Sequence, residues 1–175
     1  VDEKVRAPSG NRGCCISIQR YANAEAVSDE PWIGDFVVDI DCEGNLPKAL
    51  EDTKVVVRHL LDKKLGPDYP RVWFSGSKRI HIVVPHEVLG LQPGVNLHEM
   101  FKTAAEMITE ETGVDTIDFS IYSVRKQLRL PNSIHPKTDL YKHEIPVAAL
   151  LDMTLEQIQE LAKEESNFQP QYEPV

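Results

Sequence analysis

The sequence Asp35-Phe36-Val37-Val38-Asp39-Ile40-Asp41-Cys42 decides the fold of this chain. Its β-branched and aromatic residues, with a glycine close by on each side, predict a β-strand. Because side chains alternate between the two faces of a strand, the apolar residues at alternate positions from Phe36 to Ile40 are expected to face the core. Asp39 and Asp41 then share the opposite face.

On this strand Asp39 and Asp41 would point the same way, roughly 6–7 Å apart. With an effective dielectric constant of about 20, their mutual repulsion would cost about 2–3 kcal/mol. A divalent cation would remove that repulsion, because hard cations bind carboxylate oxygens. The alternative is that both acids lie at a solvated strand end.

The composition is that of an ordinary soluble globular protein, with 175 residues, 41% apolar and 27% charged. We expect one domain over residues 1–150, followed by a C-terminal helix and tail over 151–175. No apolar run approaches the ~20 residues that span a bilayer, so no membrane partner is expected. The net charge of −9 argues against unspecific nucleic-acid binding and leaves room for a local basic cleft.

The chain begins with Val1 and shows no signal peptide, and we expect it to be a fragment of a longer protein with other domains. Cys14, Cys15 and Cys42 have neither the spacing of a disulfide framework nor that of a zinc site. Reduced thiols, and hence a cytoplasmic protein, are the simplest interpretation.

Apolar periodicity and flanking Gly, Pro and capping residues predict the other elements. Helices are expected over 46–65, over 97–113 and from 154 onward, the last two opened by capping boxes at Asn96 and Thr154. Strands are expected over 14–21, 72–75, 79–84 and 116–122, with an edge strand or loop over 128–134. This order predicts an α+β fold, a mostly antiparallel sheet with helices packed on it.

A second group of functional candidates lies in the turn Ser75-Gly76-Ser77-Lys78-Arg79-Ile80-His81. Backbone N–H groups, hydroxyl groups and the two cations could cradle phosphates there. Taken alone, a basic hairpin turn is more often a solvated turn, and a lone histidine on a strand is more often structural.

A third group comprises Asp118, with Asp115 as its competitor, and the segment 125–138, the densest positive stretch of the chain. One explanation covers all three groups. Carboxylates would hold two divalent ions about 3.5–4 Å apart, and the basic and hydroxyl groups would hold a triphosphate. Catalysis would then be mostly positioning and electrostatics.

Taken in order, these motifs resemble the archaeo-eukaryotic primase superfamily. Its pattern is Asp-x-Asp on a strand, a Ser-Gly-x-x-Gly-x-His hairpin, an Asp, and a basic segment ending in Ser-x-His-x-Lys-Thr-Gly. The matching positions here are Asp39 to Asp41, Ser75 to His81, Asp118 and Arg129 to Thr138, within roughly residues 14–147. The sequence looks most like primase-polymerase domains of bacterial and mobile-element proteins, including CRISPR-associated ones.

The resemblance implies a primase small-subunit-like catalytic core that makes or extends primers from (d)NTPs on a single-stranded DNA template. It implies Mg²⁺ or Mn²⁺ as cofactor, with two ions held by Asp39, Asp41 and Asp118. The implied nucleotide-binding residues are Ser75, Lys78, His81, Arg129, Ser133, His135 and Lys137.

Two positions depart from the family pattern, because Arg79 and Asp139 stand where it has glycine. Arg79 could add a phosphate or template contact, or crowd the turn. The zinc-binding insertion of replicative primases is absent, which favours a minimal catalytic core. An end-joining repair polymerase, a catalytically silent primase-like module that binds nucleic acid, and a metal-dependent nuclease remain alternatives.

Overall fold

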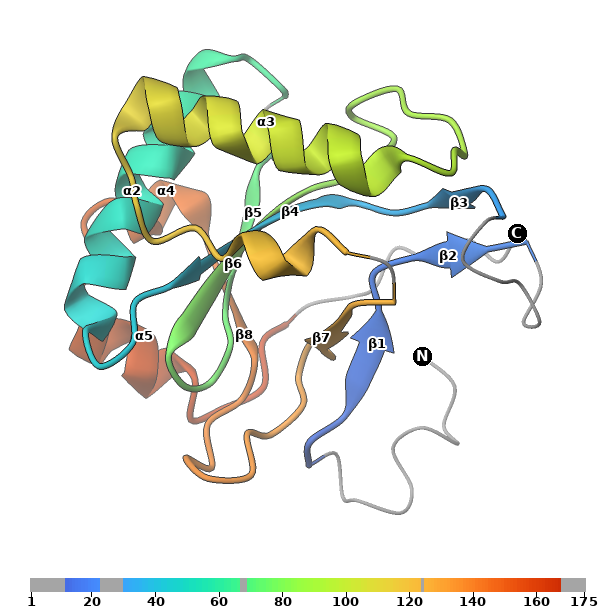
Figure 1. Cartoon of the computed structure of the whole chain (residues 1–175). Coiled ribbons are helices and arrows are strands. Elements are labelled where there is room, and N and C mark those ends of the chain that lie inside the picture. Colours follow the sequence, from blue (N-terminus) through green and yellow to red (C-terminus); the bar gives the residue numbers. More distant parts are fainter. Residues whose placement is uncertain (1–11, 23–29, 67–68, 124, 168–175) are drawn as a thin grey trace.

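A computed structural model describes residues 12–22, 30–66, 69–123 and 125–167. Its centre is a four-stranded antiparallel sheet in the order β4-β6-β5-β8, and helices pack against one face of this sheet (Figure 1). The four strands are β4 (Phe36–Asp41), β5 (Arg71–Phe74), β6 (Arg79–Val84) and β8 (His143–Ile145). The predicted α+β fold is thereby confirmed.

Strand β4 follows the predicted alternation. Phe36, Val38 and Ile40 are buried in the core, on what we call the helix face of the sheet. Asp39 and Asp41 lie on the other, polar face, and in the register of the sheet they stand opposite His81 and Arg79 of β6. The same register therefore brings the acids of one predicted motif beside the hairpin of the next.

The hairpin between β5 and β6 is confirmed, and its turn requires a glycine. Gly76 has a φ of 83°, which favours glycine, and a Cβ atom there would lie 2.7 Å from the carbonyl oxygen of Leu140. The side chain of Thr138 donates a hydrogen bond to the carbonyl oxygen of Gly76. The turn is thus packed tightly against the segment around residues 138–141.

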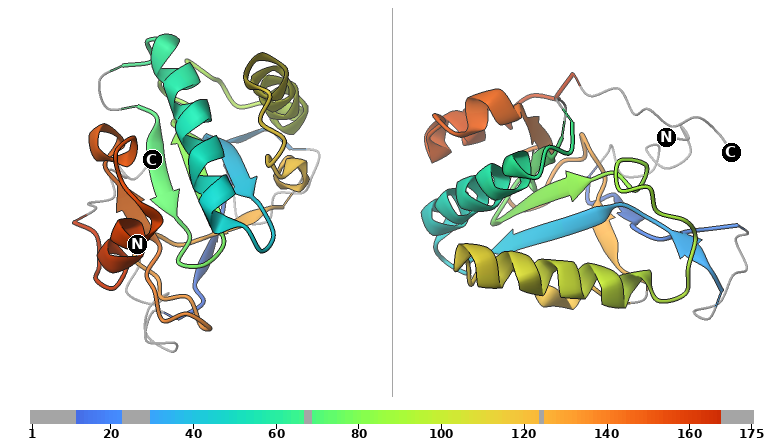
Figure 2. Two further views of the ribbon diagram at one scale, coloured as in Figure 1. Left: turned by 90° about the vertical axis from the view of Figure 1, so that its left-hand side faces the viewer. Right: turned by 90° about the horizontal axis from the view of Figure 1, so that it is seen from above.

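The two long helices cover the helix face of the sheet, as the two further views also show (Figure 2). Helix α2 (Leu46–Asp62) is capped by the side chain of Asn45, and α3 (Leu97–Thr112) ends at Gly113 with a φ of 73°. Asn96 makes no side-chain cap hydrogen bond, so the capping box predicted there is wrong. Phe36 and Phe101 pack ring against ring between β4 and α3.

Two predicted strands are corrected. The segment 14–21 forms two short strands, β1 (Cys15–Ser17) and β2 (Arg20–Tyr21), which pair with β7 (Gln127–Arg129) and β3 (Trp32–Ile33). The segment 116–122 contributes a single bridge between Ile117 and Ile40 and then turns into a 3₁₀-helix, η1 (Phe119–Ile121). The reason is local, because the side chain of Asp118 accepts a hydrogen bond from the Ser120 N–H and starts the turn.

The C-terminal part adds α4 (Val147–Leu150) and α5 (Leu155–Leu161). The capping box at Thr154 is confirmed, with reciprocal hydrogen bonds between Thr154 and Gln157. Ile158 and Ala162 join the same hydrophobic core as the sheet and α2. Over the described ranges, none of the helices has the length and apolarity needed to cross a lipid bilayer.

Candidate active site

Backbone pairing assembles three aspartates on the polar face of the sheet. The Asp118 N–H donates to the carbonyl oxygen of Asp39 at 2.8 Å, and the Asp41 N–H donates to that of Thr116 at 2.9 Å. These bonds place Asp118 beside the two acids of β4, and we call Asp39, Asp41 and Asp118 the acid cluster. The competitor Asp115 is exposed and forms an ion pair with Lys48 instead.

A single guanidinium group joins the three carboxylates. Nη1 of Arg79 contacts Oδ2 of Asp39 and lies 2.9 Å from Oδ2 of Asp118, while Nη2 lies 2.8 Å from Oδ2 of Asp41. Lys78 Nζ lies 3.1 Å from the same Asp41 oxygen. Arg79 therefore contacts the acid cluster. The sequence had suggested a phosphate or template contact for Arg79 and did not indicate this one.

The three carboxylates are donors of the kind that a hard divalent cation binds, but among the described residues only Asp35, His86 and Glu87 bring three ligand atoms within 4.8 Å of one another. Asp39 is 2% exposed, and the Oδ1 atoms of Asp39 and Asp41 are buried without a hydrogen bond in the described part of the chain. Oδ1 of Asp118 accepts a hydrogen bond from the Ser120 N–H. Buried carboxylate oxygens without a donor are costly unless a cation binds them, and Mg²⁺ and Mn²⁺ prefer such oxygens.

Burial shifts the pKa values of Asp39 and His81 in opposite directions. Burial raises the pKa of Asp39 to about 6, against the opposing effect of Arg79, and the two other carboxylates add to the rise. Burial and the nearby cations Lys142, Arg79 and Arg129 lower the pKa of His81 well below its usual range. His81 is therefore a neutral imidazole at pH 7.

A cavity of about 380 Å³ opens beside the acid cluster, and we call it the basic cavity. Five of the residues predicted to bind nucleotide line it, namely Ser75, Lys78, His81, Arg129 and His135. Arg79 and Asp39 line it as well, so the basic cavity borders directly on the acid cluster. Nη1 of Arg129 is buried and makes no hydrogen bond within the described residues, which leaves a donor for a ligand.

The two remaining predicted nucleotide-binding residues lie elsewhere. Ser133 is fully buried, and its hydroxyl donates to the carbonyl oxygen of Leu130 at 2.7 Å, so it holds a turn together rather than facing the basic cavity. Lys137 is exposed and does not line the basic cavity. Asp139 has a φ of 58°, a conformation that favours glycine and that Asp tolerates better than most residues.

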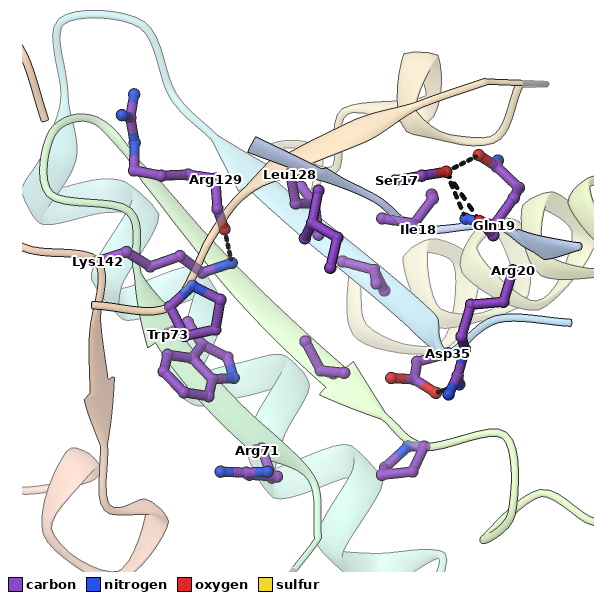
Figure 3. Close-up of a pocket in the computed structure, with 15 residues that line it drawn as sticks. Ser17, Ile18, Gln19, Arg20, Asp35, Arg71, Trp73, Leu128, Arg129 and Lys142 are labelled. Carbon is purple, nitrogen blue, oxygen red and sulfur yellow. Dashed lines mark hydrogen bonds and ion pairs between the residues drawn. The ribbon is translucent and has the colours of Figure 1, made fainter. Parts of the chain in front are cut away.

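One charged residue near the site carried no signal in the sequence. Lys142 is 4% exposed, and its Nζ donates to the carbonyl oxygen of Arg129 at 2.8 Å, 5.6 Å from the centre of the Trp73 ring (Figure 3). Burial lowers the pKa of Lys142 to about 7, with a further lowering from Arg129 and an opposing effect of Asp39. It lines a second cavity of about 270 Å³ between the β1–β7 pair and the sheet.

Comparison with known proteins gives one informative match. No protein-family model matches the sequence, and no curated protein is significantly similar to it. Among solved structures, the fold matches the polymerase domain of Mycobacterium tuberculosis Ligase D in complex with DNA, with a TM-score of 0.54 and 17% sequence identity. The match covers 83% of this chain and 57% of that one.

At this identity the match shows the fold and not the activity. The chain therefore has the α+β fold of a polymerase domain and spans a little more than half the length of the matched chain. The expectation of a mostly antiparallel α+β fold is confirmed.

Proposed function

We propose that the chain is a template-directed nucleotidyltransferase, a DNA primase or polymerase that joins (d)NTPs with Mg²⁺ or Mn²⁺. The observation that carries this proposal is the convergence of Asp39, Asp41 and Asp118 beside the basic cavity. An acid cluster next to a group of phosphate-binding side chains is what metal-assisted phosphoryl transfer requires. Template and primer DNA are the partners that this activity implies.

The acid cluster would hold the divalent ions, which activate the attacking oxygen and stabilise the charge on the leaving pyrophosphate. Lys78 and Arg129 supply positive charge and N–H donors to the triphosphate in the basic cavity. His81 is neutral at pH 7, so it binds a phosphate oxygen through a ring N–H and adds no charge. The Gly76 turn packs against the backbone of Leu140, and its neighbours Ser75 and Ser77 line the basic cavity.

An end-joining repair polymerase is the second candidate, favoured by the match to the Ligase D polymerase domain. The two candidates share the same site and differ in the DNA that they accept. Synthesis on gapped or broken ends that bear a 5′-phosphate, without initiation on bare template, would favour repair. Initiation on bare single-stranded template would favour a primase.

The test is incorporation of labelled ribo- and deoxyribonucleotides with Mg²⁺ or Mn²⁺, on bare template and on a primed template. Asp39→Ala and Asp118→Ala are each expected to lower the rate by at least about 10²-fold, because each removes a cation ligand. Asp115→Ala is the matched control, since this nearby acid pairs with Lys48 outside the acid cluster.

Equal rates in Asp39→Ala and the unchanged chain would contradict the proposal. Nucleotide binding without any incorporation would indicate a silent binding module. DNA degradation in the absence of nucleotides would indicate a nuclease.

A further inference from the structure

Arg79 occupies the centre of the acid cluster. Two nitrogens of its planar guanidinium group contact one oxygen of each aspartate, and this oxygen is Oδ2 in all three cases. The position of Arg79 is fixed by the sheet, because it stands opposite Asp41 in the pairing of β4 with β6. At this position the sequence departs from the glycine of the primase pattern that it resembles.

The contacts of Arg79 divide the carboxylate oxygens into two sets. The three Oδ2 atoms face Arg79, whereas the Oδ1 atoms of Asp39 and Asp41 are buried and make no hydrogen bond among the described residues. A divalent ion that binds all three aspartates needs an oxygen of Asp118, whose Oδ1 accepts from the Ser120 N–H and whose Oδ2 contacts Arg79. A charge-assisted contact to a carboxylate is strong, so this competition has a measurable cost.

The charges lead to the same conclusion. Three ionised aspartates carry three negative charges, and Arg79 and Lys78, both within ion-pair distance of the acid cluster, balance two of them. A divalent ion added with both cations in place would leave the group positively charged. Arg79 also lines the basic cavity, and its side chain is 36% exposed, so it has room to leave the acids.

We propose that Arg79 is a resident cation of the acid cluster that divalent metal must displace from the Oδ2 atoms of Asp39, Asp41 and Asp118. It is a positioning residue: it keeps the three carboxylates together before metal binds. On displacement it moves into the basic cavity, where it joins the groups that face the phosphates. This inference rests on the proposed function, because it takes the acid cluster as a metal site.

The test is Mn²⁺ binding to the whole chain, measured by calorimetry and by the electron paramagnetic resonance of free Mn²⁺. Arg79→Gln is expected to bind Mn²⁺ at least roughly tenfold more tightly than the unchanged chain, because it removes the competing cation. Arg79→Lys keeps the charge without the planar fork and is expected to lie between the two.

Two controls isolate the effect. Arg71→Gln removes a cation from the same face of the sheet, one that pairs with Glu144 and not with the acid cluster, and is expected to leave Mn²⁺ affinity unchanged. Adding Asp39→Ala to each chain corrects for Mn²⁺ bound elsewhere, for example at the group of Asp35, His86 and Glu87.

Thermal unfolding gives a second readout that does not depend on activity. Without metal, Arg79→Gln is expected to unfold at a lower temperature than the unchanged chain, because three carboxylates lose their shared partner. Saturating Mn²⁺ is expected to raise its unfolding temperature by more than it raises that of the unchanged chain.

The outcomes separate this inference from the proposed function. Equal Mn²⁺ affinity, or weaker affinity in Arg79→Gln, would overturn the role of Arg79 and leave the metal site standing. No Mn²⁺ binding at the acid cluster in any of these chains would overturn both.

Discussion

The two faces of the central sheet are built from alternate residues of the same strands and have opposite chemistry. On the helix face, Val38, Ile40 and Ile80 are fully buried against helices. On the polar face, Asp39 and His81 are almost as deeply buried although they are polar or charged. One strand register therefore determines both the core and the candidate site.

The difference lies in what burial does to stability on each face. Burying an aliphatic side chain contributes about 1.5–3 kcal/mol. Burying a charged group costs free energy unless partners offset it, and on the polar face these partners are other charged groups. We infer that the helix face stabilises the fold and that the polar face uses part of this stability for its chemistry.

The largest expected effect is on the helix face. Ile80→Ala should lower the free energy of unfolding by about 3–5 kcal/mol, because it leaves a cavity under the helices. Val83→Ala is the matched change on the polar face, where Val83 is only partly buried, and should cost clearly less. Urea unfolding measures both, and equal losses would contradict the division between the faces.

A smaller effect is expected at Lys142, the buried amine below the β1–β7 pair. Its pKa falls from 10.5 to about 7 on folding, so between about pH 7 and pH 10 the unfolded chain binds a proton that the folded chain does not. The free energy of unfolding is therefore highest, as far as Lys142 is concerned, above the unfolded pKa. It decreases as the pH falls from the unfolded pKa to the folded pKa.

The unchanged chain should therefore lose about 2–4 kcal/mol of stability between pH 10 and pH 7 through Lys142. Lys142→Met removes this contribution and should make the pH dependence shallower over the same range. Urea unfolding at several pH values compares the slopes, and parallel slopes for the two chains would refute the burial of a neutral amine.

The smallest effect is expected for an ion pair on the polar face that does not border the acid cluster. Arg71 contacts Glu144 through two hydrogen bonds of 2.6 and 2.9 Å, and both side chains are partly exposed. Arg71→Gln should cost about 1 kcal/mol or less in urea unfolding, because water screens the pair. A loss as large as that of Ile80→Ala would show that this pair is part of the structural core.

The sequence predicted the elements whose local signals agree with their surroundings. The alternation in β4, the Gly/Ser turn before β6 and the Thr154 capping box all appear where they were expected. The strand predicted over 116–122 was wrong. Its apolar alternation suggests a strand, whereas the Asp118 side chain starts a 3₁₀ turn after one bridge. A side chain that hydrogen-bonds its own backbone overrides such alternation.

For the candidate site, the order of the motifs identified the acids, but the sequence did not predict which way every side chain points. The three acids were named from the sequence, and the structure brings them together. Ser133 lies in the matching motif, yet its hydroxyl turns inward to a backbone carbonyl. The burial of Lys142 depends on the packing of Trp73 and Arg129, residues distant in sequence, and no local pattern indicates it.

The backbone bonds that join Asp118 to Asp39, and Asp41 to Thr116, have an evolutionary consequence. The positions of the acids are inherited with the sheet pairing and depend little on which side chains surround the basic cavity. Residues that line the basic cavity can therefore change, and with them what the cavity accepts, while the carboxylates stay in place. Selection could act on the cavity and on the acid cluster as two separable traits.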